Sequence, residues 1–327
     1  MPVRAAVLRR HAEPPSVEPC DVPVAADGEV LIDVAAAPIT PLDVLCASGT
    51  SYFGAPPLPY VPGVQGVGAV RSGSRPEPGT RVWFSTRAGM QPGDGSMRTV
   101  CVVPEADVVA LTHDVEPTLV AALGLSAIAA WMALTWRGEL SEGEQVIVLG
   151  AGGVVGQVAV QAARLGGARR VVAGCRSVAA ARRARDLGAD AVVRLDTEDV
   201  DELRDRFRAA SDGPVELVLD PVFGAPAAAA LRALAPYGRL VNLGDAADAT
   251  APIDSATLRS GSLRVLGYTN NELTAQQRTT ALLAVLAHAA AGRLTLDYET
   301  VSLDDAAKAW TRQAHGSAAK RIVLTLA

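Results

Sequence analysis

Hydrophobic residues in the first third of the chain fall in short runs that Gly and Pro separate. The breaks include Pro41, Gly49, Pro56-Pro57 and Pro62-Gly63. Short apolar runs between such breaks are typical of strands joined by turns. This part is therefore predicted to form a compact β-rich domain with functional loops. The predicted strands are Ala5–Leu8, Val30–Val34, Val67–Val70, Val82–Phe84 and Thr99–Val103.

The pattern changes near residue 118, where an Ala-rich helical stretch leads to about Trp136. Beyond it, short apolar runs alternate with helical segments. Strands that alternate with helices at this spacing indicate right-handed βαβ units and a doubly wound parallel Rossmann sheet, a fold of the α/β class. The predicted strands are Val146–Leu149, Val171–Ala173, Ala191–Val193, Val215–Leu219, Leu240–Leu243 and Leu263–Leu266. The first predicted helix between them ends at Leu165, and the next three cover Val178–Leu187, Val200–Ala209 and Pro226–Leu234.

The last sixty or so residues do not continue this alternation. A long helix over Ala275–Ala291 precedes a short strand near Tyr298–Val301, a helix over Leu303–Arg312 and a final strand over Ile322–Leu326. We interpret this as the chain returning to its first domain. The predicted division is a substrate domain from residues 1–118 and 268–327, with an inserted cofactor domain from residues 119–267. The active site is expected in the cleft between them.

The segment after the first Rossmann strand carries a glycine cluster. Gly150, Gly153 and Gly156 fit the spacing GxxGxxG, between a buried strand and a helix. Small residues let the backbone turn tightly and approach a pyrophosphate, whose charge the free N–H groups of the helix start attract. With βαβ units on both sides, the context favours a dinucleotide. Another nucleotide or S-adenosylmethionine on a similar sheet is the alternative.

The end of the second Rossmann strand separates NAD from NADP. An NAD site usually has Asp or Glu there, bonded to the ribose 2′-hydroxyl. Here the tip is Gly174-Cys175-Arg176-Ser177, and no acid follows before Asp186. A guanidinium offers a planar fork of donors to a 2′-phosphate. Arg176 therefore favours NADPH, whereas Arg182 and Arg183 are interpreted as a solvated helix face.

Composition removes several other functions. A net charge of −5 and 4% aromatic residues argue against nucleic-acid binding. The cysteines and histidines are scattered without metal-ligand spacing, so no metal site is predicted. The uncharged stretch Pro117–Trp136 is interpreted as a buried helix rather than a membrane span. We expect a soluble cytoplasmic protein with no membrane partner.

Several motifs in a fixed order resemble the zinc-free quinone oxidoreductase branch of the medium-chain dehydrogenase/reductase superfamily, over nearly the whole chain. The motifs are Ser48-Gly49 with Tyr52, Pro59–Gly63, Gly124–Ala127, Leu149–Gly156, Leu187–Asp190, Asp220-Pro221-Val222 and Gly238–Gly244. The resemblance implies a GroES-like catalytic domain built from both termini. It further implies hydride transfer from NADPH to a quinone or to the C=C bond of an α,β-unsaturated carbonyl, by a homodimer or larger assembly.

The resemblance also implies the positions of cofactor-binding residues. Ser126 is expected near the cofactor phosphates or the nicotinamide. The turn beginning at Gly150 is expected to line the pyrophosphate, with Gly152, Gly153, Val154 and Val155 in contact. The strand tip adds Arg176, expected at the 2′-phosphate, and Ser177 as further candidate cofactor-binding residues. Leu243, Gly244, Tyr268 and Asn270 are expected near the ribose and nicotinamide.

The chain also departs from its relatives. Val64-Gln65 follows Pro62-Gly63 where the zinc enzymes have His-Glu. In the quinone reductase segment N-x-x-D-x-Y, Asp43 is present, but Thr40 and Leu45 replace Asn and Tyr. These changes keep open a second reading, an NADPH-binding relative with a non-redox role as a lyase, cyclase or structural protein.

The candidate catalytic residues are Thr40, Asp43 and Tyr52. A structural role for Asp43, tying a loop to backbone donors, is favoured over acid–base chemistry. Tyr52 is interpreted either as a hydroxyl that orients a carbonyl oxygen or as a packing residue. Lys320-Arg321 is interpreted either as reaching the cofactor or as a solvated pair.

Overall fold

The computed structural model describes residues 3–326. The chain forms two compact units, one from residues 1–125 and 296–327, the other from residues 126–295. This division differs from the predicted one, because residues 268–295 belong to the second unit. Most of that stretch is helix α8 (Ala275–Ala290), whose His288 ring lies 5.4 Å from the ring of Trp131. A helical pattern in the sequence does not reveal which domain the helix packs against. The residue at which the chain returns to its first domain was therefore predicted too early.

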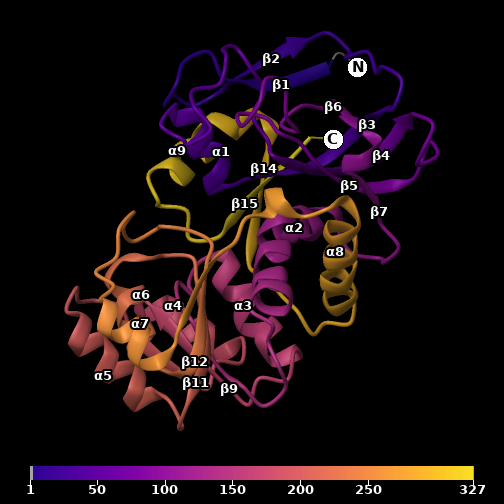
Figure 1. Cartoon of the computed structure of the whole chain (residues 1–327). Coiled ribbons are helices and arrows are strands. Elements are labelled where there is room, and N and C mark those ends of the chain that lie inside the picture. Colours follow the sequence, from indigo (N-terminus) through magenta and orange to yellow (C-terminus); the bar gives the residue numbers. More distant parts are fainter. Residues whose placement is uncertain (1–2, 327) are drawn as a thin grey trace. The chain divides into compact units, whose positions relative to one another are not determined.

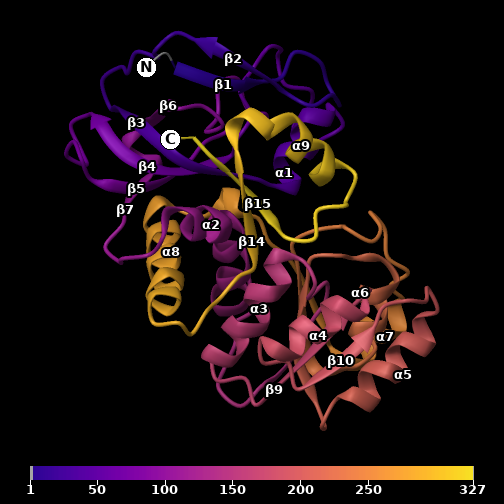
Figure 2. The same cartoon turned by 180° about the vertical axis from the view of Figure 1, so that it is seen from behind.

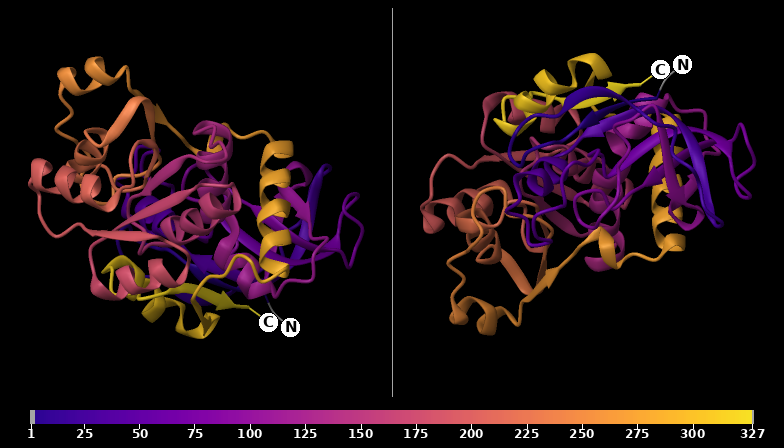
Figure 3. Two further views of the ribbon diagram at one scale, coloured as in Figure 1. Left: turned by 90° about the horizontal axis from the view of Figure 1, so that it is seen from below. Right: turned by 90° about the horizontal axis from the view of Figure 1, so that it is seen from above.

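The first unit is built on a seven-stranded sheet. Its order is β14-β15-β3-β4-β5-β7, and β6 also pairs with β3. The C-terminal strand β15 lies antiparallel to β3, with Ile322 opposite Ile39, and this pairing joins the two ends of the chain in one sheet. Both views of Figure 3 show the yellow C-terminal segment against the indigo N-terminal strands. The strands are β3 (Glu29–Ile39), β4 (Gln65–Ser72), β5 (Arg81–Ser85), β6 (Val100–Pro104), β7 (Val108–Ala110), β14 (Tyr298–Ser302) and β15 (Arg321–Thr325).

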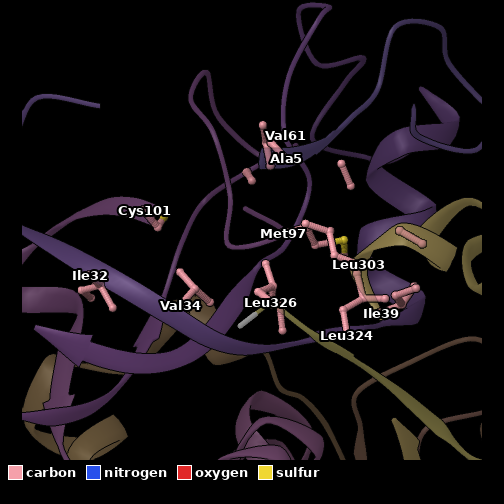
Figure 4. Packing of buried hydrophobic residues seen from close by; sticks show 14 of the residues in the cluster. Ala5, Ile32, Val34, Ile39, Val61, Met97, Cys101, Leu303, Leu324 and Leu326 are labelled. Atoms are coloured by element: carbon pink, nitrogen blue, oxygen red, sulfur yellow. The ribbon is translucent and has the colours of Figure 1, made fainter. Parts of the chain in front are cut away.

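The core of this unit lies on one face of that sheet. Ile32 and Val34 of β3 pack in one cluster with Leu324 of β15 and with Met97 (Figure 4), and all four are at most 4% exposed. Alternate residues of a strand point to the same face, which explains the spacing of two between Ile32 and Val34. A two-stranded sheet, β1 (Val3–Val7) with β2 (Ser16–Cys20), contributes Ala5 to the same cluster. The predicted β-rich domain is thus present, although β2 and β7 were not predicted.

Helix α1 (Pro41–Ser48) was also missed, because Pro41 was interpreted as a break between strands. Proline occupies the first helical position, where its missing N–H has no intrahelical partner to lose. Thr40 caps the helix, and its hydroxyl and the Asp43 carboxylate form a reciprocal capping box. Helix α9 (Ala306–Ala314) lies beside α1 in Figures 1 and 2.

Helix α2 (Pro117–Met132) contains a sharp break at Gly124, where φ is 29° and ψ is −128°. The Oε1 atom of Gln65 accepts hydrogen bonds from Leu125 N (2.7 Å) and from Trp83 Nε1 (3.0 Å) at this break. A Cβ atom on residue 124 would collide with that oxygen. Gln65, which stands where the zinc enzymes have Glu, therefore holds the helix break.

After α2 the chain makes a π-helical turn, Ala133–Arg137. The combined helix Pro117–Arg137 is long and apolar enough to cross a membrane by length and composition. However, 67% of its apolar window is buried inside the protein, as in the core helix of a globular domain. This agrees with the interpretation of the stretch as a buried helix.

The second unit contains a six-stranded parallel sheet with the order β10-β9-β8-β11-β12-β13. Strand order therefore reverses direction between β8 and β11, as in a doubly wound Rossmann sheet. The predicted fold class is confirmed. The strands are β8 (Gln145–Val148), β9 (Arg170–Cys175), β10 (Ala191–Arg194), β11 (Val215–Asp220), β12 (Leu234–Asn242) and β13 (Arg264–Gly267).

The connecting helices cover this sheet. Leu203 and Phe207 of α5 and Leu231 of α6 pack in one cluster with Ile147 of β8. Figure 1 shows α5, α6 and α7 together on one side of β11 and β12, with α3 on the other side. The fourth predicted helix ends earlier than expected, since Leu234 already begins β12. The helices are α3 (Val154–Leu165), α4 (Val178–Asp186), α5 (Val200–Ala210), α6 (Gly224–Leu231) and α7 (Ser255–Gly261).

The helix break predicts the effect of Gly124→Ala. Alanine at this position would have to adopt the strained left-handed backbone conformation. Its methyl group would also displace Gln65 Oε1 from its two donors, Leu125 N and Trp83 Nε1. We expect the free energy of unfolding to fall by about 2–5 kcal/mol, measured by urea denaturation. Gly28→Ala is the matched control, because Gly28 also has positive φ (81°) but open space around it. The control should lose only about 1–2 kcal/mol, and equal losses in the two variants would contradict the proposed role of Gln65.

Candidate functional site

The turn after β8 brings the start of α3 against the end of the strand. Gly150 has a φ of 59°, in the left-handed region that glycine adopts most easily. A Cβ atom on Gly156 would collide with the Gly150 carbonyl oxygen, and one on Gly152 would lie 2.8 Å from Ala180 Cβ. These three glycines are therefore required by the close packing of strand, turn and helix.

Gly153 is different, because no contact among residues 3–326 requires a glycine there. Its φ is an ordinary −80°, and a Cβ atom would meet only the Gly150 carbonyl oxygen at 3.5 Å. Gly153 is also exposed and begins α3 without any side-chain cap. Within the described part of the chain, the amides of Val154 and Val155 in the first turn of this 12-residue helix thus have no side-chain acceptor. An open backbone and uncapped amides together form a cradle for an anion.

The end of β9 carries an unpaired positive charge. Among residues 3–326, none forms an ion pair or a side-chain hydrogen bond with the exposed guanidinium of Arg176. Its carbonyl oxygen accepts from Arg194 Nη2 (2.8 Å). The nearby acid Asp196 is already paired, at 2.6 Å from Arg206 and 3.4 Å from Arg194. Ser177 caps α4 by accepting from Ala180 N (3.1 Å).

The loops after β11 and β12 meet beside the glycine turn. Val222 Cγ1 lies 2.7 Å from the position of a Cβ atom on Gly150, and a Cβ atom on Gly244 would lie 2.8 Å from Pro221 O. Leu243 N donates to the carbonyl oxygen of Asp220 (2.9 Å). The structure thus brings Gly150, Leu243 and Gly244 to the point where strand order reverses, which is the ligand site of open α/β sheets.

Tyr268 and Asn270 follow β13 on the same edge of the sheet. The Tyr268 hydroxyl donates to Asn270 Oδ1 (2.7 Å), and Tyr268 N donates to Asn242 O (2.9 Å). The ring packs edge-on against Trp136, and burial raises the pKa of the phenol. Ser126 is half-buried in the part of α2 that follows the break.

Thr40 and Asp43 lie in the first unit and are buried. Asp43 Oδ2 accepts from the Thr40 hydroxyl (2.6 Å) and from Thr40 N (2.8 Å), while Oδ1 accepts from Val64 N (2.9 Å). Burial raises the pKa of the Asp43 carboxyl. The hydrogen bonds from Thr40 and Val64 and the charge of Arg321 lower this pKa, but by less. The carboxylate ties a capped helix to the segment around Val64, as the structural interpretation predicted, although the tied element is a helix and not a loop.

Arg321 and Lys320 differ in their surroundings. Arg321 is 5% exposed and donates to Ile39 O (3.1 Å), and burial lowers its pKa to about 10. Lys320 is exposed, with its Nζ 3.7 Å from Asp297 Oδ2. The interpretation as a solvated pair is therefore wrong for Arg321. Its burial could not be predicted from the sequence, because a strand that begins with Arg gives no sign of a buried carboxylate nearby.

Tyr52 is 79% exposed, and its ring lies 4.1 Å from that of Phe53. It is thus an accessible phenol and not a core packing residue.

The described residues, 3–326, include no group of three or more His, Cys, Asp or Glu side chains that could hold a metal ion. Burial raises the pKa of Cys46 and of Cys175 to about 11 and that of Cys101 to about 12.

Comparison with known proteins gives a consistent result for both units. Residues 26–113 match the family model of the alcohol dehydrogenase GroES-like domain, and residues 154–288 match that of the zinc-binding dehydrogenase. Prostaglandin reductase-3 of Mus musculus is 29% identical over 244 residues, which cover 75% of this chain and 62% of that protein. The chain thus spans less than two thirds of that relative.

Solved structures are similar over almost the whole chain. A mycobacterial quinone oxidoreductase has a TM-score of 0.88 at 22% identity and covers 99% of each chain. A mycobacterial protein solved in complex with NADPH has a TM-score of 0.86 at 22% identity, again over 99% of each chain. At these identities the likeness shows the fold, a GroES-like domain with an inserted Rossmann domain. The two matched domain models and the fold together show that the chain has an alcohol dehydrogenase GroES-like domain and a zinc-binding dehydrogenase domain, the domain pair that the resemblance to the medium-chain dehydrogenase/reductase superfamily predicted.

Proposed function

We propose that the protein is an NADPH-dependent oxidoreductase that reduces a quinone or the C=C bond of an α,β-unsaturated carbonyl without zinc. The cradle at Gly153 carries this proposal, because open backbone and uncapped amides at this place serve no need of the fold itself. The unpaired Arg176 at the next strand tip adds the charge that a 2′-phosphate requires. The name of prostaglandin reductase-3 and the NADPH complex of a structural relative support the same reading.

The residues present fit this cofactor. The first turn of α3, from Gly152 to Val155, would hold the pyrophosphate, and Arg176 with Ser177 would hold the 2′-phosphate. Leu243, Gly244, Tyr268 and Asn270 would lie on the ribose and nicotinamide side, together with Ser126. When bound, NADPH supplies the hydride that the acceptor takes up.

The proposed acceptor is a conjugated carbonyl because it spreads the developing negative charge onto its own oxygen. Such an oxygen needs only hydrogen-bond donors, not a strong Lewis acid. The Thr40 hydroxyl already donates to Asp43, so it is not available as that donor. We assign this role to the exposed hydroxyl of Tyr52 and to water, which also supplies the proton.

A non-redox role as a lyase, cyclase or structural protein is the second candidate. It is favoured by the capping box, which occupies the hydroxyl of Thr40 where the quinone reductase segment has Asn, and by the half-exposed Leu45 in place of its Tyr. The two candidates differ in whether NADPH is consumed.

We also propose that the protein works in the cytoplasm as a homodimer on small molecules, without nucleic-acid or membrane partners. The negative net charge of −5 supports the absence of a nucleic-acid partner. Size-exclusion chromatography with light scattering measures the molar mass of the protein in solution. A monomeric mass would contradict the proposed homodimer.

Loss of Arg176 should affect one cofactor. Arg176→Ala removes a charge-assisted contact of about 1.5–3 kcal/mol, so NADPH affinity should fall about tenfold to a hundredfold, and NADH affinity should hardly change. Calorimetric titration with both cofactors measures this. Arg182→Ala, an exposed arginine on α4, should leave both affinities within about twofold. Equal weakening of NADPH and NADH in Arg176→Ala would show that this residue does not recognise the 2′-phosphate.

Labelled cofactor tests the chemistry. With NADPH deuterated at the transferring position, an enone product should carry deuterium at its β-carbon, and saturated ketones should react poorly. Mass spectrometry and NMR of the products locate the label. Efficient reduction of simple ketones, with no turnover of enones or quinones, would overturn the proposed mechanism.

Zinc content gives a third check. Because no cluster of ligands is present among residues 3–326, we expect far less than one zinc per chain by elemental analysis of purified protein. Treatment with a chelator should leave activity intact. A stoichiometric, tightly held zinc would refute the zinc-free mechanism.

A further inference from the structure

One buried carboxylate in the second unit has no role in the function described so far. Asp220 ends β11, is fully buried, and forms no ion pair with any described Arg or Lys side chain. Its Oδ1 accepts from Val222 N (3.0 Å) and Phe223 N (2.8 Å), and its Oδ2 accepts from Asn242 Nδ2 (3.0 Å). A buried charge without a cationic partner is expensive, and burial raises the pKa of this group while its three donors lower it.

The carboxylate stabilises a strained backbone. Phe223 has a φ of 57° and a ψ of −152°, which is unfavourable for any residue other than glycine. Strain of this kind persists only where surrounding contacts fix it, and it concentrates at functional sites. Here the Phe223 N–H is fixed by Asp220 Oδ1. The same loop places Val222 Cγ1 over Gly150.

The carboxylate also reaches the next loop through Asn242. The Nδ2 group of Asn242 donates to Asp220 Oδ2 and to Gly244 O (2.8 Å), so it joins the loops after β11 and β12. Leu243 N adds a bond to the Asp220 carbonyl oxygen (2.9 Å). Asp220 thus controls the position of Leu243 and Gly244, the residues assigned to the nicotinamide and ribose.

We propose that Asp220 is a positioning residue that, through Asn242, sets the nicotinamide side of the cofactor site. This inference rests on the proposed function. The role of Asp220 can be tested separately from that of Arg176. Strand β8 lies between β11, which ends at Asp220, and β9, whose tip carries Arg176. The adenosine side therefore does not depend on the link from Asp220 through Asn242 to Gly244.

The test is Asp220→Asn in the full-length chain. The new side chain retains an oxygen for Val222 N and Phe223 N, but its amide then faces Asn242 Nδ2, donor against donor. Asn242 restores the bond only by turning its own amide over, which removes its donor from Gly244 O. The substitution thus loosens Gly244 while keeping the size of the side chain.

Calorimetric titration with NADPH and with adenosine 2′,5′-bisphosphate measures the two halves separately. For Asp220→Asn we expect NADPH affinity to fall tenfold to a hundredfold, with less than a twofold change for the bisphosphate. Binding of the bisphosphate itself shows that the variant is folded. Asp199→Asn is the matched control, since Asp199 Oδ1 also accepts from two backbone amides, at the start of α5. It should change neither affinity more than about twofold.

Asn242→Ala provides a second variant, in case Asp220→Asn does not fold. It removes the link to Gly244 and leaves the two backbone bonds of Asp220, so the same selective loss should appear, at about threefold to tenfold. Equal weakening of both ligands, or no change in either, would overturn the role of Asp220. A wild-type chain that binds neither ligand would instead refute the proposed function, and the inference with it.

Discussion

The close approach of α3 to the end of β8 is the constraint on which the site depends. Gly156 lies so near the Gly150 carbonyl oxygen that no side chain fits between them. This contact aims the first turn of α3 at the edge of the sheet where strand order reverses. Because Gly153 caps the helix without a side chain, the amides of that turn remain available to an anion. The close packing of Gly156 against Gly150 therefore fixes the turn after β8. That turn leaves the amides at the start of α3 open to an anion.

Charge and loop geometry distinguish the two ends of this edge. The unpaired guanidinium of Arg176 lies at the tip of β9, while the loops after β11 and β12 are fixed by the buried Asp220. One end of the site thus presents an unpaired positive charge, and the other a backbone that hydrogen bonds hold in place. This is the division that a dinucleotide with a 2′-phosphate at one end and an uncharged reacting ring system at the other would need.

Local signals in the sequence predicted the second unit well. Each βαβ unit has a recognisable sequence pattern of a buried strand, a turn and a helix. The sheet could therefore be predicted without information on tertiary contacts. Helix α1 was missed because Pro41 breaks a strand and starts a helix equally well. The boundary at residue 268 was wrong because helix α8 carries no signal for its packing partner.

The site residues that the sequence failed to reveal are those defined by distant partners. Gln65 meets Leu125 and Trp83, and Arg321 lies near Asp43, across long separations in the chain. No spacing rule links such positions. Asp220 was visible only as part of a motif, because its hydrogen bonds to Val222 and Phe223 depend on a backbone conformation that propensity does not predict. Catalytic assignments to Thr40 and Asp43 failed to anticipate that these groups would bond to one another.

The central claim is that the cradle and Arg176 serve a redox reaction. The most direct measurement is the ratio of NADPH oxidised to product formed, followed in parallel for a panel of quinones and enones. The account predicts that each molecule of reduced product consumes one NADPH. Product that forms while NADPH remains intact would contradict the account and favour the non-redox role.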